Sequence, residues 1–234
     1  MRERTRAVRG FVLGAVALFG LVTASVADAA QVPSRADTTI TFTVAGMSCS
    51  GCAKTAAELL RKVEGVLKAD VNFKTKQATL RTNGAVTENQ IRIALGAVGF
   101  EPRFRGETAL PPLTPEERAR LDIQTVSRGE AIVVRDHVAS GKITMFDFFA
   151  DWCGPCHLLT PKLERLVLNH DNLALRKVDI SDWDTPAAKQ ATEEFKMPGL
   201  PYVRIYDDRG QLLGAVHGNH IDQVGRIVER GRRP

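Results

Sequence analysis

The sequence has few cysteines, few aromatic residues and no long apolar run beyond its start. Apart from residues 11–22, no stretch approaches the roughly 20 apolar residues that a membrane-spanning helix needs. Aromatic residues make up 6% of the chain, and no dense cluster of Lys and Arg is interleaved with them. This argues against a nucleic-acid-binding surface, so we expect no nucleic-acid partner. The four cysteines all lie in two CxxC pairs, and no other repeat relates the two halves of the chain.

The N-terminus has the pattern of an export signal. Four arginines precede residue 10, the apolar run 11–22 follows, and small residues stand at Ala27 and Ala29. This order is typical of a cleaved secretory signal peptide, which we predict for residues 1–29. The mature protein would then be periplasmic in a two-membrane bacterium. The alternative is an uncleaved signal-anchor in the inner membrane, with the rest of the chain facing the periplasm.

The remaining sequence divides into two flanks around a linker. Three prolines, many charges and little apolar periodicity mark residues 106–129, with a single helical turn expected after Thr114 and Pro115. Residues 38–105 hold ten Lys and Arg against five Asp and Glu, whereas residues 140–234 hold thirteen of each. The sequence therefore predicts two small domains, at 38–105 and 130–234, the first of them basic.

The first flank is predicted to be a small α+β domain. β-Branched alternation indicates strands, and apolar residues at helical spacing indicate helices. The predicted elements are a strand at 38–44, a helix at 54–63, strands at 67–73 and 77–81, a helix at 87–98 and a strand at 100–104. The order βαββαβ is the split βαβ arrangement of a ferredoxin-like fold.

The second flank is predicted to be an α/β domain with a central mixed sheet. Residues 143–150 are almost continuously apolar, which is typical of a strand buried on both faces. Helices are expected at 131–140, 157–169, 186–195 and 221–230, and the other strands at 173–180, 202–206 and 212–217. Helices that alternate with strands in this way pack on both faces of one sheet.

The first cysteine pair has the chemistry of a metal clamp. Cys49 and Cys52, in GMSCSGC, fall between a predicted strand and a predicted helix, so both sulfurs are expected in an exposed loop. A helix N-terminus favours thiolate. Two thiolates without a neighbouring third ligand suit a soft cation such as Cu(I) or Hg(II), whereas zinc normally takes four ligands. The second pair lies about a hundred residues away, too far for the known spacings of zinc sites.

Residues 38–105 resemble heavy-metal-associated domains, the modules of copper chaperones, metal-pumping ATPases and periplasmic mercury-binding proteins. The likeness rests on GMSCSGC, on VEGV at 63–66, on ADVNF at 69–73 and on GF at 99–100. It implies that Cys49 and Cys52 are the metal ligands, and that Met47 and Phe100 are buried near the loop rather than ligating. Ser50–Gly51 is more like copper modules, and residues 62–73 are more like the mercury protein, so the metal stays open between Cu(I) and Hg(II). No organic cofactor is expected.

The second pair has the chemistry of a redox switch. Cys153 and Cys156, in WCGPC, again lie between a predicted strand and helix, so Cys153 is expected to be exposed and Cys156 shielded behind it. A thiolate there can attack a disulfide and form a mixed disulfide that the second thiol resolves. The ring of Pro155 stiffens the turn and disfavours rearrangement around a metal.

Residues 130–230 closely resemble thioredoxin. The likeness covers FFADWCGPCHLLTP, Lys177, MPGLPYV and Gly218. It implies catalytic roles for Cys153 and Cys156, together with four further positions: Trp152 in the motif, Asp147 as the buried acid that takes the proton of the resolving thiol, Lys177 beside that acid, and Pro201 as a cis-proline that docks substrate backbone. A purely structural ion pair is the alternative for Asp147 and Lys177. Leu200, where a β-branched residue is usual, and His157, where Lys or Arg is usual, depart from the pattern.

The two resemblances together predict an exported thiol–disulfide oxidoreductase with a tethered soft-metal-binding domain. Reduction is the expected direction, because CGPC in thioredoxins belongs to the low-potential end. The expected partners are protein thiol or disulfide clients, a membrane electron donor and a metal-transfer partner. The alternative is a periplasmic metallochaperone or metal-detoxification protein in which the thioredoxin-like domain is accessory.

Overall fold

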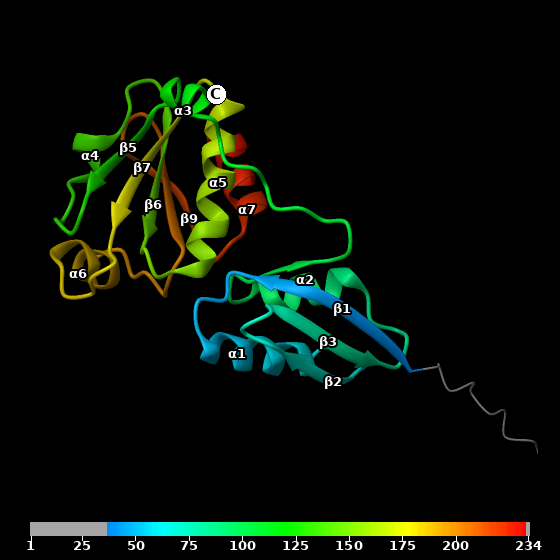
Figure 1. Ribbon diagram of the computed structural model, residues 1–234. Helices are drawn as coiled ribbons and strands as arrows, with labels where there is room; N and C mark the ends of the chain where they lie inside the picture. The colour runs from blue at the N-terminus through cyan, green and yellow to red at the C-terminus, as the bar shows by residue number, and fades with distance from the viewer. Residues whose placement is uncertain (1–36, 233–234) are drawn as a thin grey trace, which may run out of the picture. The chain divides into compact units, whose positions relative to one another are not determined.

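The computed structural model describes residues 37–232 and contains two separate sheets, each with its own helices (Figure 1). The predicted signal peptide, with the signal-anchor alternative, lies outside the described residues. Within residues 37–232, no helix has the length and apolar character needed to cross a membrane. The two sheets confirm the predicted mixture of α+β and α/β architecture.

The N-terminal sheet has the predicted βαββαβ order. Its elements are β1 (Thr38–Ala45), α1 (Ser50–Arg61), β2 (Val66–Val71), β3 (Gln77–Thr82), α2 (Glu88–Gly96) and β4 (Glu101–Arg103). The strands are antiparallel neighbours in the order β2-β3-β1-β4. Thr87 and Gln90 form the capping box that starts α2, because each side chain accepts from the other residue's backbone N–H.

Alternation along β1 explains why only one face of this sheet is covered. Phe42 and Val44 are buried, while Thr41 and Thr43 on the opposite face are exposed. The apolar side packs against α1 and α2, and Leu60 of α1 is one of the buried side chains in this core. The register also places the start of β3 beside the end of β1, because Thr43 pairs with Gln77. The turn between β2 and β3 therefore lies at the end of the sheet where the cysteine loop begins.

The C-terminal sheet has the predicted mixed topology. Its elements are α3 (Pro115–Ala119), β5 (Ile123–Ser127), α4 (Val134–His137), β6 (Ile143–Phe149), α5 (Gly154–Leu168), β7 (Leu173–Asp179), α6 (Pro186–Glu193), β8 (Tyr202–Tyr206), β9 (Leu212–His217) and α7 (Ile221–Gly231). The strand order is β5-β7-β6-β8-β9, with β5, β7 and β6 parallel and β8 and β9 antiparallel. Figure 1 shows α5 and α7 on one face of this sheet and α6 on the other.

The central strand β6 is buried on both faces, as its apolar run predicts. Met145 belongs to the core beneath α5 and α7, and Phe146 and Phe148 belong to the core beneath α6. Because side chains alternate along a strand, Asp147 shares the face of Met145. The sequence thus places a single carboxylate among apolar residues under α5, where Asp147 is fully buried.

Two predictions about the segment before β6 need correction. Residues 123–127, assigned to the linker, form β5 and extend the sheet beside β7. Arg176 fastens this edge, since its guanidinium donates to the carboxylate of Asp122 over 2.7 Å. The strand was missed because it is short and follows a charged, proline-rich stretch. The single helical turn predicted after Thr114 and Pro115 is present as α3.

The helix predicted at 131–140 is restricted to α4, four residues long. Its N-cap residue, Val133, supplies no side-chain hydrogen bond, and both Val133 and Val138 have extended backbone. A run of β-branched residues without a capping side chain favours extended structure, which explains why the helix does not lengthen.

Candidate functional site

The first cysteine pair lies where β1 turns into α1. Gly46 has a φ of +92°, a left-handed conformation that glycine adopts readily, and it turns the chain out of the strand. Cys49 is the N-cap of α1, and its sulfur accepts from the backbone N–H of Cys52 over 3.2 Å. Cys49 is exposed and Cys52 is half-buried, and both are free thiols. The predicted exposed loop before a helix is therefore what the structure contains.

The surroundings of Cys52 favour its thiolate. Partial burial opposes ionisation, but hydrogen bonds from the Cys49 side chain, from the backbone of Ser48 and Cys49 and from the Ser48 side chain outweigh it. The pKa of the Cys52 thiol is consequently below its usual range. A thiolate is the form in which cysteine binds metal.

The donor set fits a soft metal ion of low coordination number. The two cysteines are separated by two residues, Ser50 and Gly51, at the N-terminus of α1, and Cys49 is accessible from solvent. In the part of the chain from 37 to 232, no group of three or more His, Cys, Asp or Glu side chains is placed to hold a metal. Two thiolates alone suit Cu(I) or Hg(II) better than a tetrahedral metal such as zinc.

The residues beneath this loop are core residues. Met47 and Phe100 are 6% and 7% exposed and belong to the cluster under α1 and α2, as predicted. Lys76, in the turn between β2 and β3, was not predicted: its ammonium donates to the carbonyl of Met47 over 2.9 Å. No local sequence signal marks Lys76, because only strand register brings it to the cysteine loop.

The second cysteine pair lies where β6 turns into α5. Cys153 is the N-cap of α5, its sulfur accepts from the N–H of Cys156 over 3.2 Å, and the two sulfurs form a disulfide. The prediction that Cys153 is exposed is wrong for this oxidised form, because Cys153 is 4% exposed and Cys156 is 1% exposed. Phe149 and Leu200 pack against the cluster that the two cysteines form with Ala150.

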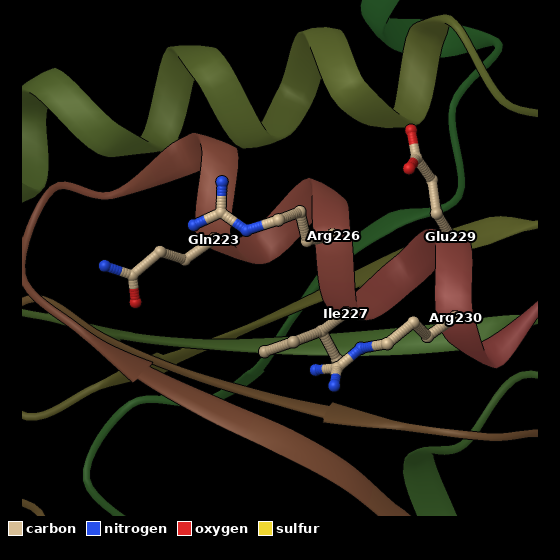
Figure 2. A pocket seen from close by; sticks show the side chains of 5 residues that line it. All are labelled: Gln223, Arg226, Ile227, Glu229 and Arg230. Atoms are coloured by element: carbon tan, nitrogen blue, oxygen red, sulfur yellow. The ribbon is translucent and has the colours of Figure 1, made fainter.

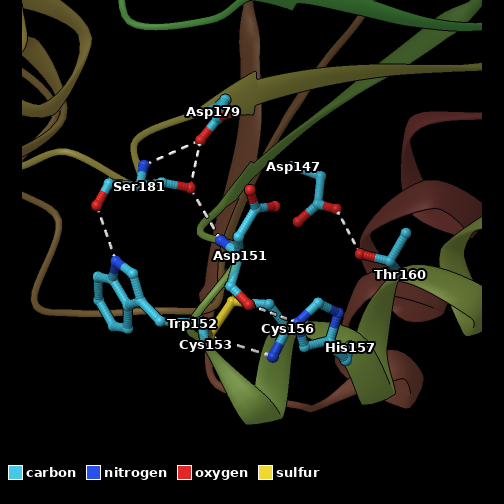
Figure 3. The surroundings of a disulfide bond; sticks show 9 residues. All are labelled: Asp147, Asp151, Trp152, Cys153, Cys156, His157, Thr160, Asp179 and Ser181. Atoms are coloured by element: carbon cyan, nitrogen blue, oxygen red, sulfur yellow. Dashed lines mark hydrogen bonds between the residues drawn. A yellow bond between two sulfur atoms is a disulfide. The ribbon is translucent and has the colours of Figure 1, made fainter.

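Behind the disulfide, Asp147 keeps one oxygen without a partner. Its Oδ2 accepts from the Thr160 hydroxyl over 3.0 Å (Figure 3), whereas its buried Oδ1 has no hydrogen-bond partner. Burial raises the pKa of Asp147 to about 6; the Thr160 hydrogen bond and the charge of Lys177 oppose this rise, and the charge of Glu164 adds to it. The carboxyl can therefore change protonation state near neutral pH.

One face of α5 connects Cys156 to this carboxyl. Cys156, Thr160 and Glu164 follow one another at intervals of four residues, so they lie on the same side of the helix. Thr160 bonds to Asp147, and the buried Glu164 pairs with Arg118 of α3 over 3.0 Å. Sequence reasoning missed Thr160 and Glu164, although the i, i+4 spacing from Cys156 would have indicated them.

Lys177 lies beside Asp147, as predicted. The two residues are register partners on the parallel strands β6 and β7. The ammonium of Lys177 lies over the ring of Phe149, 4.5 Å from its centroid, and affects the pKa of Asp147 through its charge. Lys177 thus acts on Asp147 through its charge, while Oδ1 of Asp147 has no hydrogen-bond partner. A purely structural ion pair would use that oxygen.

The loop before β8 brings Leu200 to the disulfide and contains Pro201. The peptide bond between Leu200 and Pro201 is cis, as predicted. The carbonyl of Pro201 accepts from the N–H of Gly218 over 2.8 Å, which fixes the loop against the end of β9. Leu200 packs against the cysteine cluster. One of the two residues that depart from the thioredoxin pattern therefore packs against the redox centre.

Trp152 belongs to an exposed aromatic pair. Its indole N–H donates to the carbonyl of Ser181 over 2.7 Å, and its ring centroid is 5.8 Å from that of Trp183. The N–H of Asp151 donates to the Ser181 hydroxyl, which in turn donates to Asp179 (Figure 3). Trp152 and Trp183 are 48% and 46% exposed, which leaves an apolar surface beside the disulfide. Trp183 was not predicted, since it lies in the loop after β7.

A surface hollow of about 520 Å³ lies along α7 and is distinct from both cysteine pairs. Figure 2 shows its lining side chains, Gln223, Arg226, Ile227, Glu229 and Arg230, all of α7. It contains neither a thiol nor an imidazole, and we assign it no role in the redox chemistry.

Comparison with known proteins finds two families in this chain. The family model of the heavy-metal-associated domain matches residues 41–101, and the thioredoxin model matches residues 132–229. Thioredoxin of Chlamydia trachomatis is 32% identical over 95 residues, which are 41% of this chain and 87% of that protein. An H-type thioredoxin of Fagopyrum esculentum is 34% identical over 85 residues, 36% of this chain and 68% of that protein.

Solved structures also resemble parts of this chain. Spinach chloroplast thioredoxin f is 26% identical with a TM-score of 0.39, covering 54% of this chain and 99% of that one. Oxidised MerP from Ralstonia metallidurans CH34 is 34% identical with a TM-score of 0.28, covering 30% of this chain and 99% of that one. On the family models and the curated relatives, the chain belongs to the thioredoxin family: it is a thiol–disulfide oxidoreductase that carries a heavy-metal-associated domain ahead of its thioredoxin domain.

Proposed function

We propose that this protein is an exported disulfide reductase whose tethered metal-binding domain carries a soft metal ion as cargo. The contrast between the two cysteine pairs supports this proposal. Cys153 and Cys156 close into a buried disulfide with the free oxygen of Asp147 on the same side of the sheet as α5. Cys49 and Cys52 are free thiols in an open loop. The first arrangement suits electron transfer, and the second suits ligation.

In the proposed reaction, the thiolate of reduced Cys153 attacks one sulfur of a client disulfide. The client disulfide breaks, a Cys153–client disulfide forms, and one client thiolate leaves. The thiolate of Cys156 then attacks the sulfur of Cys153, which releases the second client thiolate and forms the Cys153–Cys156 disulfide. Two electrons have passed to the client, and a dithiol donor must return them before the next cycle.

Asp147 is proposed to take the proton of Cys156 during the second attack. The transfer needs an acceptor that is ionised near neutral pH and has an unused oxygen. Asp147 has both properties, because its pKa is raised to about 6 and its Oδ1 has no partner. A carboxyl with the ordinary pKa of an aspartate would be a weaker base toward a thiol.

Protein disulfides are the proposed clients. Trp152 and Trp183 offer an exposed aromatic surface next to the disulfide, and Leu200 adds an apolar contact. Aromatic side chains of this kind contribute much of the binding energy at protein surfaces. We further propose that the protein is exported to an oxidising compartment, because residues 1–29 have the pattern of a signal peptide. In that compartment a membrane dithiol donor would resupply electrons.

Cys49 and Cys52 are proposed to hold Cu(I) or Hg(II) between their two sulfurs. Mass spectrometry of the reduced Cys153→Ser, Cys156→Ser protein, in which only the first thiol pair remains, should detect one equivalent of Cu(I) or Hg(II) bound even when Zn(II) competes, because two thiolates leave zinc short of ligands. Replacing the first pair in this background, Cys49→Ser with Cys52→Ser, should remove this equivalent. Retention of the metal after that replacement would contradict the assignment.

The two sites are proposed to be coupled by thiol–disulfide exchange. In an oxidising compartment Cys49 and Cys52 can form a disulfide, and a disulfide cannot ligate metal. Reduced Cys153 on the same chain would attack that disulfide at the high effective concentration that tethering provides. The proposed consequence is that the thioredoxin domain keeps the metal site in its binding form.

This coupling can be tested by trapping its intermediate. In the Cys156→Ser variant Cys153 can attack the oxidised first pair, which frees one thiolate of that pair, but no Cys156 thiol is present to resolve the product; once the free thiolate is alkylated, a disulfide from Cys153 to Cys49 or Cys52 should accumulate. Peptide mass spectrometry of monomeric protein would identify it. The Cys153→Ser variant is the matched control and should form no such cross-link. If the Cys156→Ser monomer remains free of cross-link after oxidation of the first pair, the coupling within one chain is wrong.

A metallochaperone with an accessory thioredoxin domain is the second candidate. It is favoured by the exposure of Cys49, which would let a partner's thiolates compete for the bound ion. In that case metal tolerance would depend only on the first pair and would survive loss of Cys153. The reductase proposal requires that disulfide reduction depend on the second pair alone.

A further inference from the structure

Lys76 has a backbone conformation that its side chain disfavours. Its φ is +57°, and among residues 37–232 the only other non-glycine residue with a positive φ is Lys196. Most residues with a Cβ avoid this left-handed region, and glycine adopts it readily. A lysine at such a position therefore suggests that its side chain does something glycine could not.

The side chain of Lys76 reaches the cysteine loop. Its ammonium donates to the carbonyl of Met47 over 2.9 Å and lies over the ring of Phe73, 3.6 Å from the centroid. The backbone of Lys76 acts on the same segment, because its carbonyl accepts from the N–H of Val44 over 2.7 Å. Residues 44–47, which lead from β1 into the cysteine loop, are thus held from both ends by one residue.

We propose that Lys76 is a positioning residue of the Cys49–Cys52 metal site, fixing the start of its loop and supplying a positive charge beside it. This inference rests on the proposed metal binding at those two sulfurs. Met47, whose carbonyl Lys76 binds, is two residues before Cys49.

Charge gives the proposal a metal-dependent consequence. Two thiolates carry two negative charges, so a site filled by Cu(I) retains one and a site filled by Hg(II) retains none. A fixed cation nearby stabilises the charged form more than the neutral one. The ammonium of Lys76 should therefore contribute more to Cu(I) binding than to Hg(II) binding.

The test compares two substitutions, of which only one relieves the strained backbone of Lys76. Lys76→Met keeps a long side chain but removes the charge and the donor, and Lys76→Gly also relieves the positive φ. We expect both variants of the full chain to lose roughly 10- to 100-fold in Cu(I) affinity, measured by competition with a chromophoric chelator. The loss should be smaller for Hg(II), and Lys76→Arg should restore most of the Cu(I) affinity.

The thermal midpoint of the metal-free protein separates positioning from folding. Lys76→Gly should leave it unchanged or raised while still weakening Cu(I) binding. Lys74→Met is the matched control, because Lys74 is exposed in the same turn, and it should bind Cu(I) like the wild type. The proposal is overturned if Lys76→Gly binds Cu(I) normally while Cys49→Ser with Cys52→Ser does not. If that double variant also binds normally, the metal site itself is wrong, and the role of Lys76 falls with it.

Discussion

Replacing Cys153 with Ser should abolish the reduction of protein disulfides by this chain. Cys153 is the N-cap of α5 and the sulfur proposed to attack the client, and no hydroxyl can substitute for a thiolate in that exchange. We expect a fall in rate on the order of 10³-fold or more, as removal of a catalytic nucleophile commonly causes. The measurement is reduction of insulin disulfides with a dithiol as electron source.

The matched control removes the other pair. Cys49→Ser with Cys52→Ser should leave insulin reduction unchanged, since these sulfurs lie in a separate loop at the start of α1. It should remove metal binding, which Cys153→Ser should leave intact in the reduced protein. If insulin reduction instead requires the first pair, the division of chemistry between the two sites is wrong.

The same CxxC spacing serves both chemistries because of what surrounds each pair. Both first cysteines are N-caps that accept from the N–H of the second cysteine over 3.2 Å. The local geometry is therefore shared. Around Cys153 and Cys156 the chain adds Phe149 and Leu200, which pack against the cysteine cluster. In the first pair Cys52 packs partly against the N-terminal core, and Cys49 remains accessible from solvent.

The sequence was most informative where one strand or helix carries the whole pattern. The resemblance to thioredoxin implied the burial of Asp147, and the apolar run 143–150 predicted a strand buried on both faces because such a pattern needs no tertiary information. Thr87 predicted the start of α2 for the same reason, since its cap is made with Gln90 three residues away. Both cysteine loops were likewise predicted from local order.

Contacts between distant segments could not be predicted in this way. Lys76 reaches Met47 across 29 positions, and only the pairing of β1 with β3 brings them together. The strand β5 is short and owes its place to pairing with β7 and to Arg176. Leu200, which packs against the cluster of Cys153 and Cys156, arrives from a loop nearly fifty residues later. Each of these depends on tertiary register rather than on local propensity.

Asp147→Asn should slow disulfide reduction and also change how the stability of the oxidised protein depends on pH. The amide can still accept from Thr160 but cannot take a proton from Cys156. We expect the rate at pH 7 to fall on the order of 10²-fold, the lower end of what a positioned proton acceptor contributes. The rate should approach that of the wild type above about pH 8.5, where the thiol ionises without help. An unchanged rate and pH profile would reject the role in proton transfer.

The stability effect follows from the raised pKa of Asp147. In the unfolded chain the carboxyl ionises near pH 3.8, and in the folded protein it ionises near pH 6. Between these values the folded state binds the extra proton, so the free energy of unfolding falls as the pH rises through this window. Above about pH 6 the folded protein bears the full cost of a buried carboxylate, about 3 kcal/mol from a shift of about two units.

The asparagine variant lacks this ionisation. Its free energy of unfolding, relative to that of the wild type, should therefore rise by about 2.4 kcal/mol between pH 4 and pH 8. Because this is a difference between two pH values, it is independent of the constant cost of placing an amide in the buried site. Urea unfolding of the oxidised proteins would measure it, with Asp151→Asn, an exposed carboxylate near the same strand end, as the control. If the two asparagine variants show the same pH dependence, Asp147 is not the group that titrates near pH 6, and its part in the proton transfer falls with that result.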